Sequence, residues 1–385
     1  MSTQAWLLSH TMHYLTGGGH LWVYLNWALG LREAGCEVTW LEVVQPEKSP
    51  EETLDLARKL RERLRPFGLA DRLALCTIDA SPLHPMLADE FITLEHAANA
   101  DVLLNLRYAT DAKIIRQFKR SILLDIDPGL LQLWVSRGEV TIAPHDIYFT
   151  IGPTVGKPGS PIPSLGLTWH HTPPAVATSA WHVTPPGPNA AFNTISHWQA
   201  VEWIEESPGN YYCNNKRAGF EPFLDLPLLT QAAPLELALC LHETDEPDRQ
   251  LLLKKGWRVV HSYDVSSTLD DYQHYIQNSL GEFSCAKPSC QRMQNAWVSD
   301  RTLCYLASGK PVIVLHTGPS DILPDNEGMF RYKTVQQAAS AVDRVMADYP
   351  NQCRLARQLA VERFDAKMLA TRMLELALQP SLSRR

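Results

Sequence analysis

The segment Ser299–Val314, SDRTLCYLASGKPVIV, decides the fold. Ser299 or Asp300 is suited to cap a helix, the following small and apolar residues continue it, and Gly309 ends it. The residues from Pro311 onward have the composition of a buried strand, and Gly281–Lys287, GEFSCAK, predicts another strand before the helix. Strand, helix and strand in this order form a βαβ unit, which requires a parallel sheet.

The same alternation runs through the rest of the chain. In the first half, a strand at Trp6–Ser9 is followed by the Gly-rich turn Thr16–His20, a helix at Leu21–Ala34 and a strand at Glu37–Val44. Further strands are predicted at Val102–Leu106, Ser121–Asp127, Tyr148–Ile151, Ala191–Ile195, Leu235–Leu241 and Arg258–Tyr263, and further helices at Pro50–Arg65, Val335–Tyr349 and Cys353–Leu378. We therefore expect an α/β protein with two Rossmann-like, doubly wound domains.

The two halves are separated by residues 152–188, which are rich in Pro, Gly, His and Trp and lose hydrophobic periodicity. A loop this long in a compact enzyme is usually functional or a linker. We place the domain boundary at its end, which gives an N-terminal domain of residues 1–188 and a C-terminal domain of residues 189–355. Residues 356–385 are expected to form a C-terminal helix that packs back toward the N-terminal domain.

Composition narrows the classes of partner. The formal net charge of −7 lacks the basic footprint that nucleic-acid binding calls for. The N-terminus has no secretory signal, and no apolar run approaches the roughly 20 residues of a membrane helix. None of the eight cysteines forms a CxxC pair, so we expect no metal site. We expect a cytoplasmic protein without a membrane span, and the sequence leaves its oligomeric state open.

A first candidate phosphate site is the glycine run. Gly18 and Gly19 lie between a strand and a helix, where backbone N–H groups and the helix dipole favour an anion. The run lacks the GxGxxG spacing of a dinucleotide site and the Lys-Ser/Thr pair of a P-loop. The alternative is a tight turn without a ligand.

A second candidate lies in the C-terminal half. Lys287, Arg301 and the N–H groups at Ser299 and Asp300 are suited to hold a diphosphate together. Thr317-Gly318 follows the next strand, at the edge where open α/β sheets bind ligands. The alternative is that both basic side chains are simply solvated.

His20 is the candidate general base. It lies in the first turn of a predicted helix, where the dipole favours a neutral imidazole that can accept a proton from a hydroxyl. Asp125 and Asp127 share one face of a strand end, and either is expected to orient the ring. We do not interpret this pair as a metal site, and the alternative for His20 is a capping or packing role.

Three segments carry a family resemblance. Asp300–Val314 resembles the "E-A-hydrophobic-A-x-G-x-P-V-I" segment of GT-B glycosyltransferases, and Gly17–His20 with Gly35–Thr39 is similar to their N-terminal opening. The chain also resembles glycosyltransferase-like proteins that carry "DxDPG", "GEFSxAK" and "SDRxxCYLASGxPV" segments. The resemblance implies two domains facing a central cleft, and transfer of a sugar from a nucleotide diphosphate (UDP, GDP or dTDP) without a cofactor or metal.

The resemblance also implies roles for single residues. The C-terminal domain would bind the donor, with Lys216 and Arg217 reaching its phosphates, and the N-terminal domain would bind the acceptor. His20 corresponds to the histidine that serves as base in many inverting members. Trp169 and His170, in the loop-rich middle, are the acceptor-site candidates, although most tryptophans pack in cores.

The chain departs from the family at the glutamates. The Glu-x7-Glu pattern of retaining members is absent, because Cys290 stands eight positions after Glu282. The carboxylate that usually holds the donor ribose falls on Cys304, so Asp300 or Glu282 is the candidate substitute, and Glu282 joins His20 and Asp127 as a catalytic candidate. Retention or inversion stays open, as do two rivals: a sugar-nucleotide epimerase and an inactive binding protein of the same fold.

Overall fold

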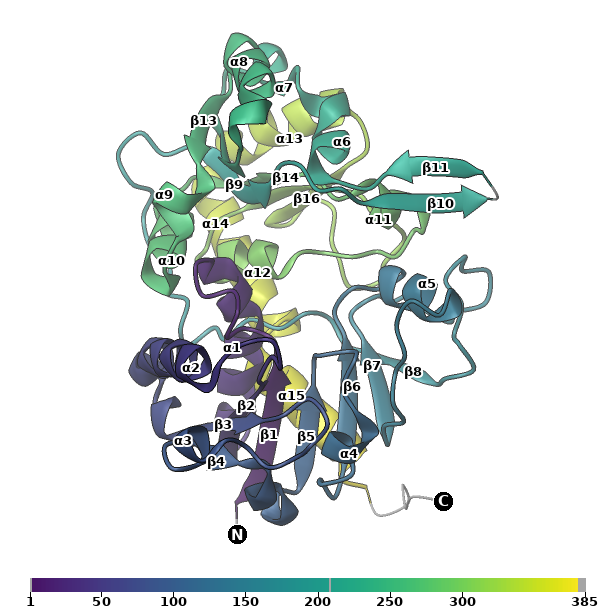
Figure 1. Ribbon diagram of the computed structural model, residues 1–385. Coiled ribbons are helices and arrows are strands. Elements are labelled where there is room, and N and C mark those ends of the chain that lie inside the picture. Colours follow the sequence, from purple (N-terminus) through teal and green to yellow (C-terminus); the bar gives the residue numbers. More distant parts are fainter. Residues whose placement is uncertain (1, 208, 380–385) are drawn as a thin grey trace. The chain divides into compact units, whose positions relative to one another are not determined.

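The computed structural model describes residues 2–207 and 209–379 (Figure 1). The chain divides into two compact units. Unit 1 comprises the residues up to Ala177 and those from Asp365 onward, and unit 2 is Thr178–Phe364. The predicted boundaries, after residues 188 and 355, therefore lie near these divisions but do not coincide with them.

Unit 1 is built on an eight-stranded sheet in which every pair of neighbouring strands is parallel. In order across the sheet, its strands are β4 (Ile92–Thr93), β3 (Leu73–Cys76), β2 (Cys36–Val43), β1 (Thr3–Ser9), β5 (Val102–Asn105), β6 (Ser121–Asp125), β7 (Ile147–Thr150) and β8 (Trp169–His171). The chain runs outward from β1 in both directions, which makes the gap between β1 and β5 the switch point where such sheets bind ligands.

Both faces of this sheet are covered. Trp6 and Leu8 pack with Ile114 and Phe118 on one face, while Leu7, which alternates with them, is fully buried on the other. The helices of unit 1 are α1 (Gly18–Glu33), α2 (Pro50–Leu64), α3 (Pro85–Ala88), α4 (Ala112–Ile115), α5 (Leu130–Ser136) and α15 (Ala366–Ala377), with short 3₁₀ turns at Arg65–Phe67, Ala70–Arg72 and Leu94–Asn99.

Unit 2 has a six-stranded parallel sheet. Its strands, in order across the sheet, are β13 (Arg258–His261), β12 (Leu235–Cys240), β9 (Phe192–His197), β14 (Gly281–Ser284), β15 (Val312–Leu315) and β16 (Met329–Tyr332). Counted from β9, this is the 3-2-1-4-5-6 order of a Rossmann domain, with its switch point between β9 and β14. The prediction of two doubly wound parallel domains is confirmed.

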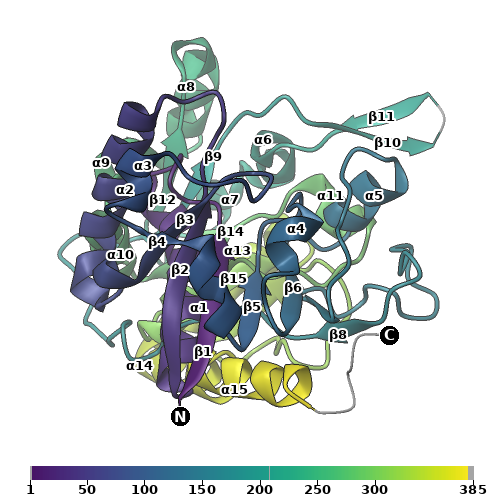
Figure 2. The same cartoon turned by 60° about the horizontal axis from the view of Figure 1, so that its bottom comes forward.

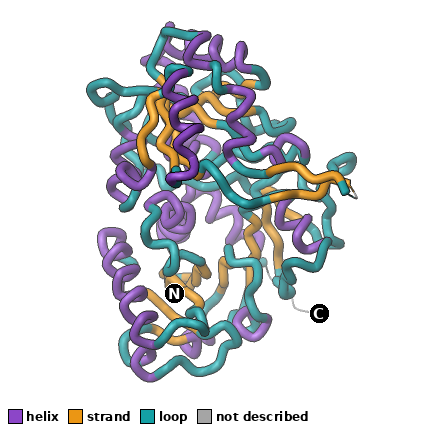
Figure 3. The backbone as a smooth tube through the Cα atoms, turned by 45° about the horizontal axis from the view of Figure 1, so that its top comes forward, coloured by secondary structure: helices purple, strands orange, loops and turns teal. Residues whose placement is uncertain are grey.

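The remaining elements of unit 2 surround its sheet. The antiparallel hairpin of β10 (Trp203–Ser207) and β11 (Asn210–Cys213) projects from the unit as a separate ribbon (Figure 3). The helices are α6 (Lys216–Phe220), α7 (Leu226–Leu229), α8 (Glu246–Lys254), α9 (Ser262–Ser266), α10 (Leu269–Gln277), α11 (Pro288–Arg292), α12 (Asp300–Ala307), α13 (Val335–Ala347) and α14 (Tyr349–Arg363), with 3₁₀ turns at Glu221–Phe223 and Glu243–Asp245. In the described part of the chain, no helix has the length and apolarity to cross a bilayer.

The predicted helix Cys353–Leu378 is wrong, because it breaks at Phe364-Asp365. The Asp365 carboxylate accepts a hydrogen bond from the backbone N–H of Met368 at 3.2 Å and so caps a new helix, α15. α15 packs against α1 in unit 1 (Figure 2), so the chain returns to the unit in which it began. Residues 380–385 of the predicted segment lie outside the described residues.

Gly30 in α1 allows α15 to pack this closely. A Cβ at this position would lie 2.5 Å from the carbonyl oxygen of Ala366, a backbone atom that cannot rotate away. Gly30→Ala gains about 1 kcal/mol of helix propensity but should lose more through overpacking, for a net loss of about 1–2 kcal/mol in unfolding free energy. Urea unfolding measures the difference. Gly17→Ala, where a Cβ meets nothing within 4 Å, is the control, and a Gly30→Ala protein more stable than wild type would contradict the packing.

Candidate functional site

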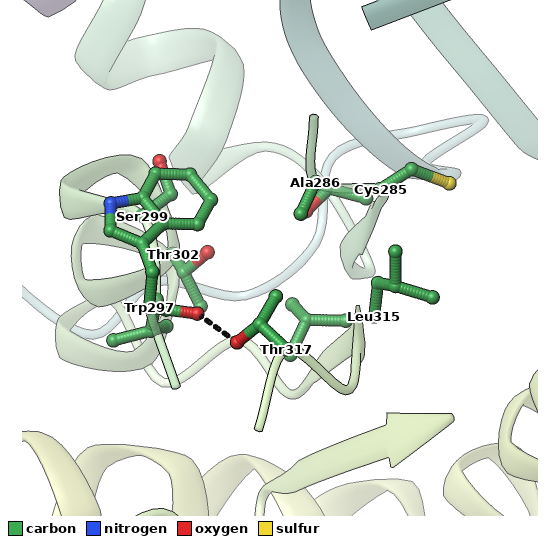
Figure 4. Close-up of a pocket in the computed structure, with 10 residues that line it drawn as sticks. Cys285, Ala286, Trp297, Ser299, Thr302, Leu315 and Thr317 are labelled. Carbon is green, nitrogen blue, oxygen red and sulfur yellow. Dashed lines mark hydrogen bonds between the residues drawn. The ribbon is translucent and has the colours of Figure 1, made fainter. Parts of the chain in front are cut away.

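A pocket lies at the carboxyl edge of the unit 2 sheet, beside the switch point. It is lined by the residues that follow β14, by the end of β15 and by the start of α12, namely Ser284, Cys285, Ala286, Trp297, Val298, Ser299, Thr302, Val314, Leu315 and Thr317 (Figure 4). The Thr317 hydroxyl donates to the Trp297 carbonyl at 2.7 Å and fixes the two loops to each other. The predicted donor residues Ser299 and Thr317 both belong to this pocket.

The start of α12 offers hydrogen-bond donors to the pocket. Ser299 is the N-cap, yet its side chain makes no capping bond within the described residues. The hydroxyl of Thr302 is buried at the pocket wall and has no hydrogen-bond partner among the described residues. Backbone N–H groups of a first helical turn, together with a hydroxyl, are suited to bind an anion.

Lys216 is the cation beside the pocket. Its ammonium donates to the carbonyl of Cys285 at 3.0 Å and lies 5.3 Å from the centre of the Trp297 ring. Burial, and to a smaller extent repulsion from the Arg301 charge, lowers the pKa of Lys216 to about 8. Gly219 permits the approach, because a Cβ there would lie 2.1 Å from the Ala286 carbonyl oxygen. No carboxylate of the described residues lies within salt-bridge distance of Lys216.

Arg301 and Glu282 form an ion pair beneath this site. The Arg301 Nε donates to Glu282 Oε1 at 2.8 Å, and its Nη1 donates to the Ile195 carbonyl at 2.7 Å. Burial alone would lower the pKa of Arg301, but attraction to Glu282, to Tyr272 and to Tyr305 together outweighs it and raises that pKa. The Glu282 side chain is 0% exposed and its Oε1 accepts from Arg301, so these contacts give no support to a catalytic or ribose-binding role.

The other predicted donor residues have different partners. Lys287 forms an ion pair with Glu202 at 2.5 Å, and Arg217 pairs with Asp248 at 2.7 Å, on the side of α6 that faces Trp198. A diphosphate held jointly by Lys287 and Arg301 therefore has no support from these contacts, and Arg217 is not brought together with Lys216.

Gly318 has a structural explanation, whereas Asp300 stays a predicted donor contact. A Cβ on Gly318 would lie 2.6 Å from the carbonyl oxygen of Gln294, so the loop packing alone requires glycine. Asp300 is the first residue of α12, and its carbonyl oxygen accepts from the thiol of Cys304 at 3.4 Å.

In unit 1, the glycine run opens α1 directly. Gly17 is the N-cap, and Gly18, Gly19 and His20 form the first turn, so the helix begins earlier than predicted. Gly17 has an ordinary φ of −127°, and a Cβ there would meet no atom within 4 Å. Gly17 is therefore not required by a left-handed turn or by close packing. Gly18 and Gly19 stay predicted phosphate contacts.

His20 is held by a backbone carbonyl. Its Nε2 lies 2.7 Å from the carbonyl oxygen of His10, and because a carbonyl only accepts, Nε2 carries the hydrogen. The neutral ring then has its lone pair on Nδ1, which makes no hydrogen bond within the described residues. Tyr14 and Tyr24 contact the ring edge-on, with centroids at 5.0 and 5.3 Å. The geometry fits a general base.

The prediction that Asp125 or Asp127 orients His20 is wrong. Asp125 is fully buried and accepts hydrogen bonds from Gln132 at 2.9 Å and Thr150 at 2.8 Å, while burial raises the pKa of its carboxyl to about 6. Asp127 accepts from the Tyr108 hydroxyl at 2.9 Å. The two aspartates clamp the turn between β6 and α5. Within the described residues, no group of three or more His, Cys, Asp or Glu side chains could hold a metal.

Sequence reasoning missed Glu42, which shapes the loop before His20. This buried carboxylate accepts from the hydroxyls of Ser9 and Thr11, from the Thr11 N–H at 3.0 Å and from the Trp40 indole at 3.2 Å. A glutamate inside the apolar strand β2 was the signal available in the sequence.

Trp169 and His170 lie far from His20 across the sheet. They belong to β8, and four strand spacings of about 4.8 Å place that strand about 19 Å from β1. The indole of Trp169 donates to the Ser164 carbonyl at 2.9 Å and packs edge-on against Tyr148. His170 packs against Phe149. The structure does not bring these predicted acceptor residues to the predicted base.

Comparison with known proteins shows the fold. No family model matches the chain, and no curated protein matches it. Among solved structures, the chain is similar to Anabaena HepE in complex with UDP, with a TM-score of 0.54 and 11% identity over 97% of this chain and 99% of HepE. The chain has the GT-B fold. An α-glucosyltransferase in complex with UDP-glucose and DNA containing an abasic site gives a TM-score of 0.55 and 10% identity, over 98% and 99% of the two chains.

The buried ion pair yields a stability prediction. Arg301→Leu leaves the Glu282 carboxylate buried without its cation, which should lower the unfolding free energy by about 3–5 kcal/mol. The double variant Arg301→Leu/Glu282→Leu removes both charges and should recover most of that loss. Thermal and urea unfolding of both variants measure the effect. If the double variant is less stable than Arg301→Leu, the pair does not act as described.

Proposed function

We propose that this protein is a glycosyltransferase that moves a sugar from a nucleotide diphosphate donor to an acceptor hydroxyl. Unit 2 binds the donor and unit 1 binds the acceptor. The observation that carries the proposal is the pocket at the β9/β14 edge, where Lys216 and the first turn of α12 meet. Its support is the GT-B fold, because HepE and the α-glucosyltransferase were solved with UDP or UDP-glucose.

Charge on the leaving diphosphate is the chemical problem of such a transfer. As the glycosidic bond breaks, negative charge grows on the diphosphate, and preorganised donors stabilise it. The Lys216 ammonium, the N–H groups at the start of α12 and the Thr302 hydroxyl supply them, while Arg301 adds a fixed positive charge close to Lys216. We propose that these groups replace a metal ion.

His20 acts on the acceptor. A hydroxyl is a poor nucleophile until its proton is removed, and Nδ1 of the neutral ring is placed to remove it. The His10 carbonyl favours this tautomer before the transfer, because only Nε2–H satisfies it, and the ring becomes an imidazolium when Nδ1 takes the hydroxyl proton. This role applies to an inverting transfer, in which the acceptor attacks directly.

Donor binding should depend on the charge of Lys216. Because burial lowers its pKa to about 8, the free protein loses this charge as pH rises through about 8, and UDP affinity should fall between about pH 7 and pH 9. Lys216→Arg keeps its charge over this range and should show a flatter profile. Lys216→Met should bind UDP about 10- to 100-fold more weakly near pH 7.

Calorimetric titration of UDP measures these affinities, and thermal shift with UDP, GDP, dTDP and ADP identifies the preferred base. If Lys216→Met binds all four nucleoside diphosphates as tightly as wild type, Lys216 does not belong to the donor site. If no nucleoside diphosphate binds the wild-type protein, the proposed function fails.

Turnover should depend on His20. His20→Ala should lower acceptor-dependent release of nucleoside diphosphate by ~10²–10⁴-fold and leave UDP affinity unchanged. His96→Ala, which removes an exposed histidine of unit 1, is the matched control. Near wild-type turnover in His20→Ala, or a product that keeps the donor's anomeric configuration, would remove the base assignment.

A further inference from the structure

Arg107 and His10 follow the two strands, β5 and β1, that flank the switch point of unit 1. Leu8 of β1 pairs with Asn105 of β5, and the Leu106 N–H donates to the Leu8 carbonyl at 3.1 Å. His10 lies two residues after Leu8, and Arg107 lies two residues after Asn105. The positive charge of Arg107 acts on His10, and together with burial it lowers the pKa of that imidazole.

Arg107 is a partly buried cation without a counter-ion. Its Nη1 donates to the Ala109 carbonyl at 2.7 Å, and no carboxylate of the described residues lies within salt-bridge distance of the guanidinium. Burial lowers the pKa of Arg107. Glu42, the nearest negative charge that acts on it, already accepts four hydrogen bonds from Ser9, Thr11 and Trp40.

A half-buried guanidinium without a counter-ion favours the binding of an anion. Removing an unpaired charge from water costs free energy, and a bound carboxylate or phosphate recovers it through charge-assisted, often bidentate hydrogen bonds. The neighbouring histidines offer no negative charge, and both ring nitrogens of His13 are buried without a hydrogen-bond partner in the described chain.

We propose that Arg107, with His10, forms an anion subsite that binds a carboxylate or phosphate group of the acceptor. The subsite would fix the acceptor by its charged group and leave a hydroxyl for His20, whose Nε2 bonds the His10 carbonyl. That the bound anion belongs to the acceptor rests on the proposed glycosyl transfer, whereas the anion subsite itself rests on residues of unit 1 alone.

The subsite is tested by NMR of the His10 imidazole in the full chain, with its signal assigned from His10→Gln. Inorganic phosphate and acetate are titrated separately, without UDP and again with saturating UDP, which under the proposed function occupies the donor pocket. A bound anion should raise the pKa of His10, because it offsets the Arg107 charge. Phosphate and acetate distinguish the two kinds of anionic group.

Arg107→Gln is the decisive variant. It should raise the pKa of His10 in the free protein and weaken the anion response at least about 10-fold. Arg116→Gln removes an exposed arginine of the same unit and should change neither. A wild-type protein without an anion response, or a response that Arg107→Gln retains, overturns the subsite.

Activity separates the subsite from the proposed function. With glucose, glucuronate and glucose 6-phosphate as matched acceptors, a charged member should be preferred, and Arg107→Gln should raise its KM without changing that of glucose. An Arg107-dependent anion response in a protein that does not bind UDP would refute the transfer and leave the subsite standing. An anion response that saturating UDP abolishes would assign Arg107 to the donor and overturn the acceptor role.

Discussion

The ion pair between Glu282 and Arg301 is the interaction on which unit 2 depends. A glutamate in a central parallel strand cannot remain charged without a partner, and Arg301 supplies one from the second residue of α12. Its guanidinium also bonds the Ile195 carbonyl in β9, so one side chain joins the two strands of the switch point to the helix. The start of α12 is thereby fixed at the edge where the pocket lies.

Unit 1 also buries a carboxylate in a strand, but there neutral hydrogen-bond donors stabilise it. Glu42 is buried in β2 and accepts only from neutral donors: Ser9 at the end of β1, Thr11 in the loop that leads to α1, and Trp40 in β2. This network shapes the backbone at His10, and the His10 carbonyl in turn sets the tautomer of His20. A carboxylate inside the core thus determines which nitrogen of His20 is free, although it does not touch the ring.

The two ligand edges differ in their cations. In unit 2, Lys216 lies at a formed pocket and within the field of Arg301, so its charge depends on pH near neutrality. In unit 1, Arg107 keeps its charge at every relevant pH and lowers the basicity of His10. Under the proposed function, Lys216 and Arg107 supply positive charge to anionic reactants in a protein whose net charge is −7.

The sequence alone determined the two parallel α/β units, most of their strands, α12 and the place of His20 at a helix start, because these follow from hydrophobic periodicity and capping residues within a few positions. It missed β3, β4, β8, β16 and the hairpin strands β10 and β11, which are short or have little pattern of their own and become strands by pairing with neighbours. Only the tertiary structure decided the side-chain partners: Lys216 donates to the Cys285 carbonyl, Lys287 pairs with Glu202, and the charge of Arg107 acts on His10. Such partners lie tens of residues apart, and local propensity carries no information about which distant groups the folded sheets bring to one edge.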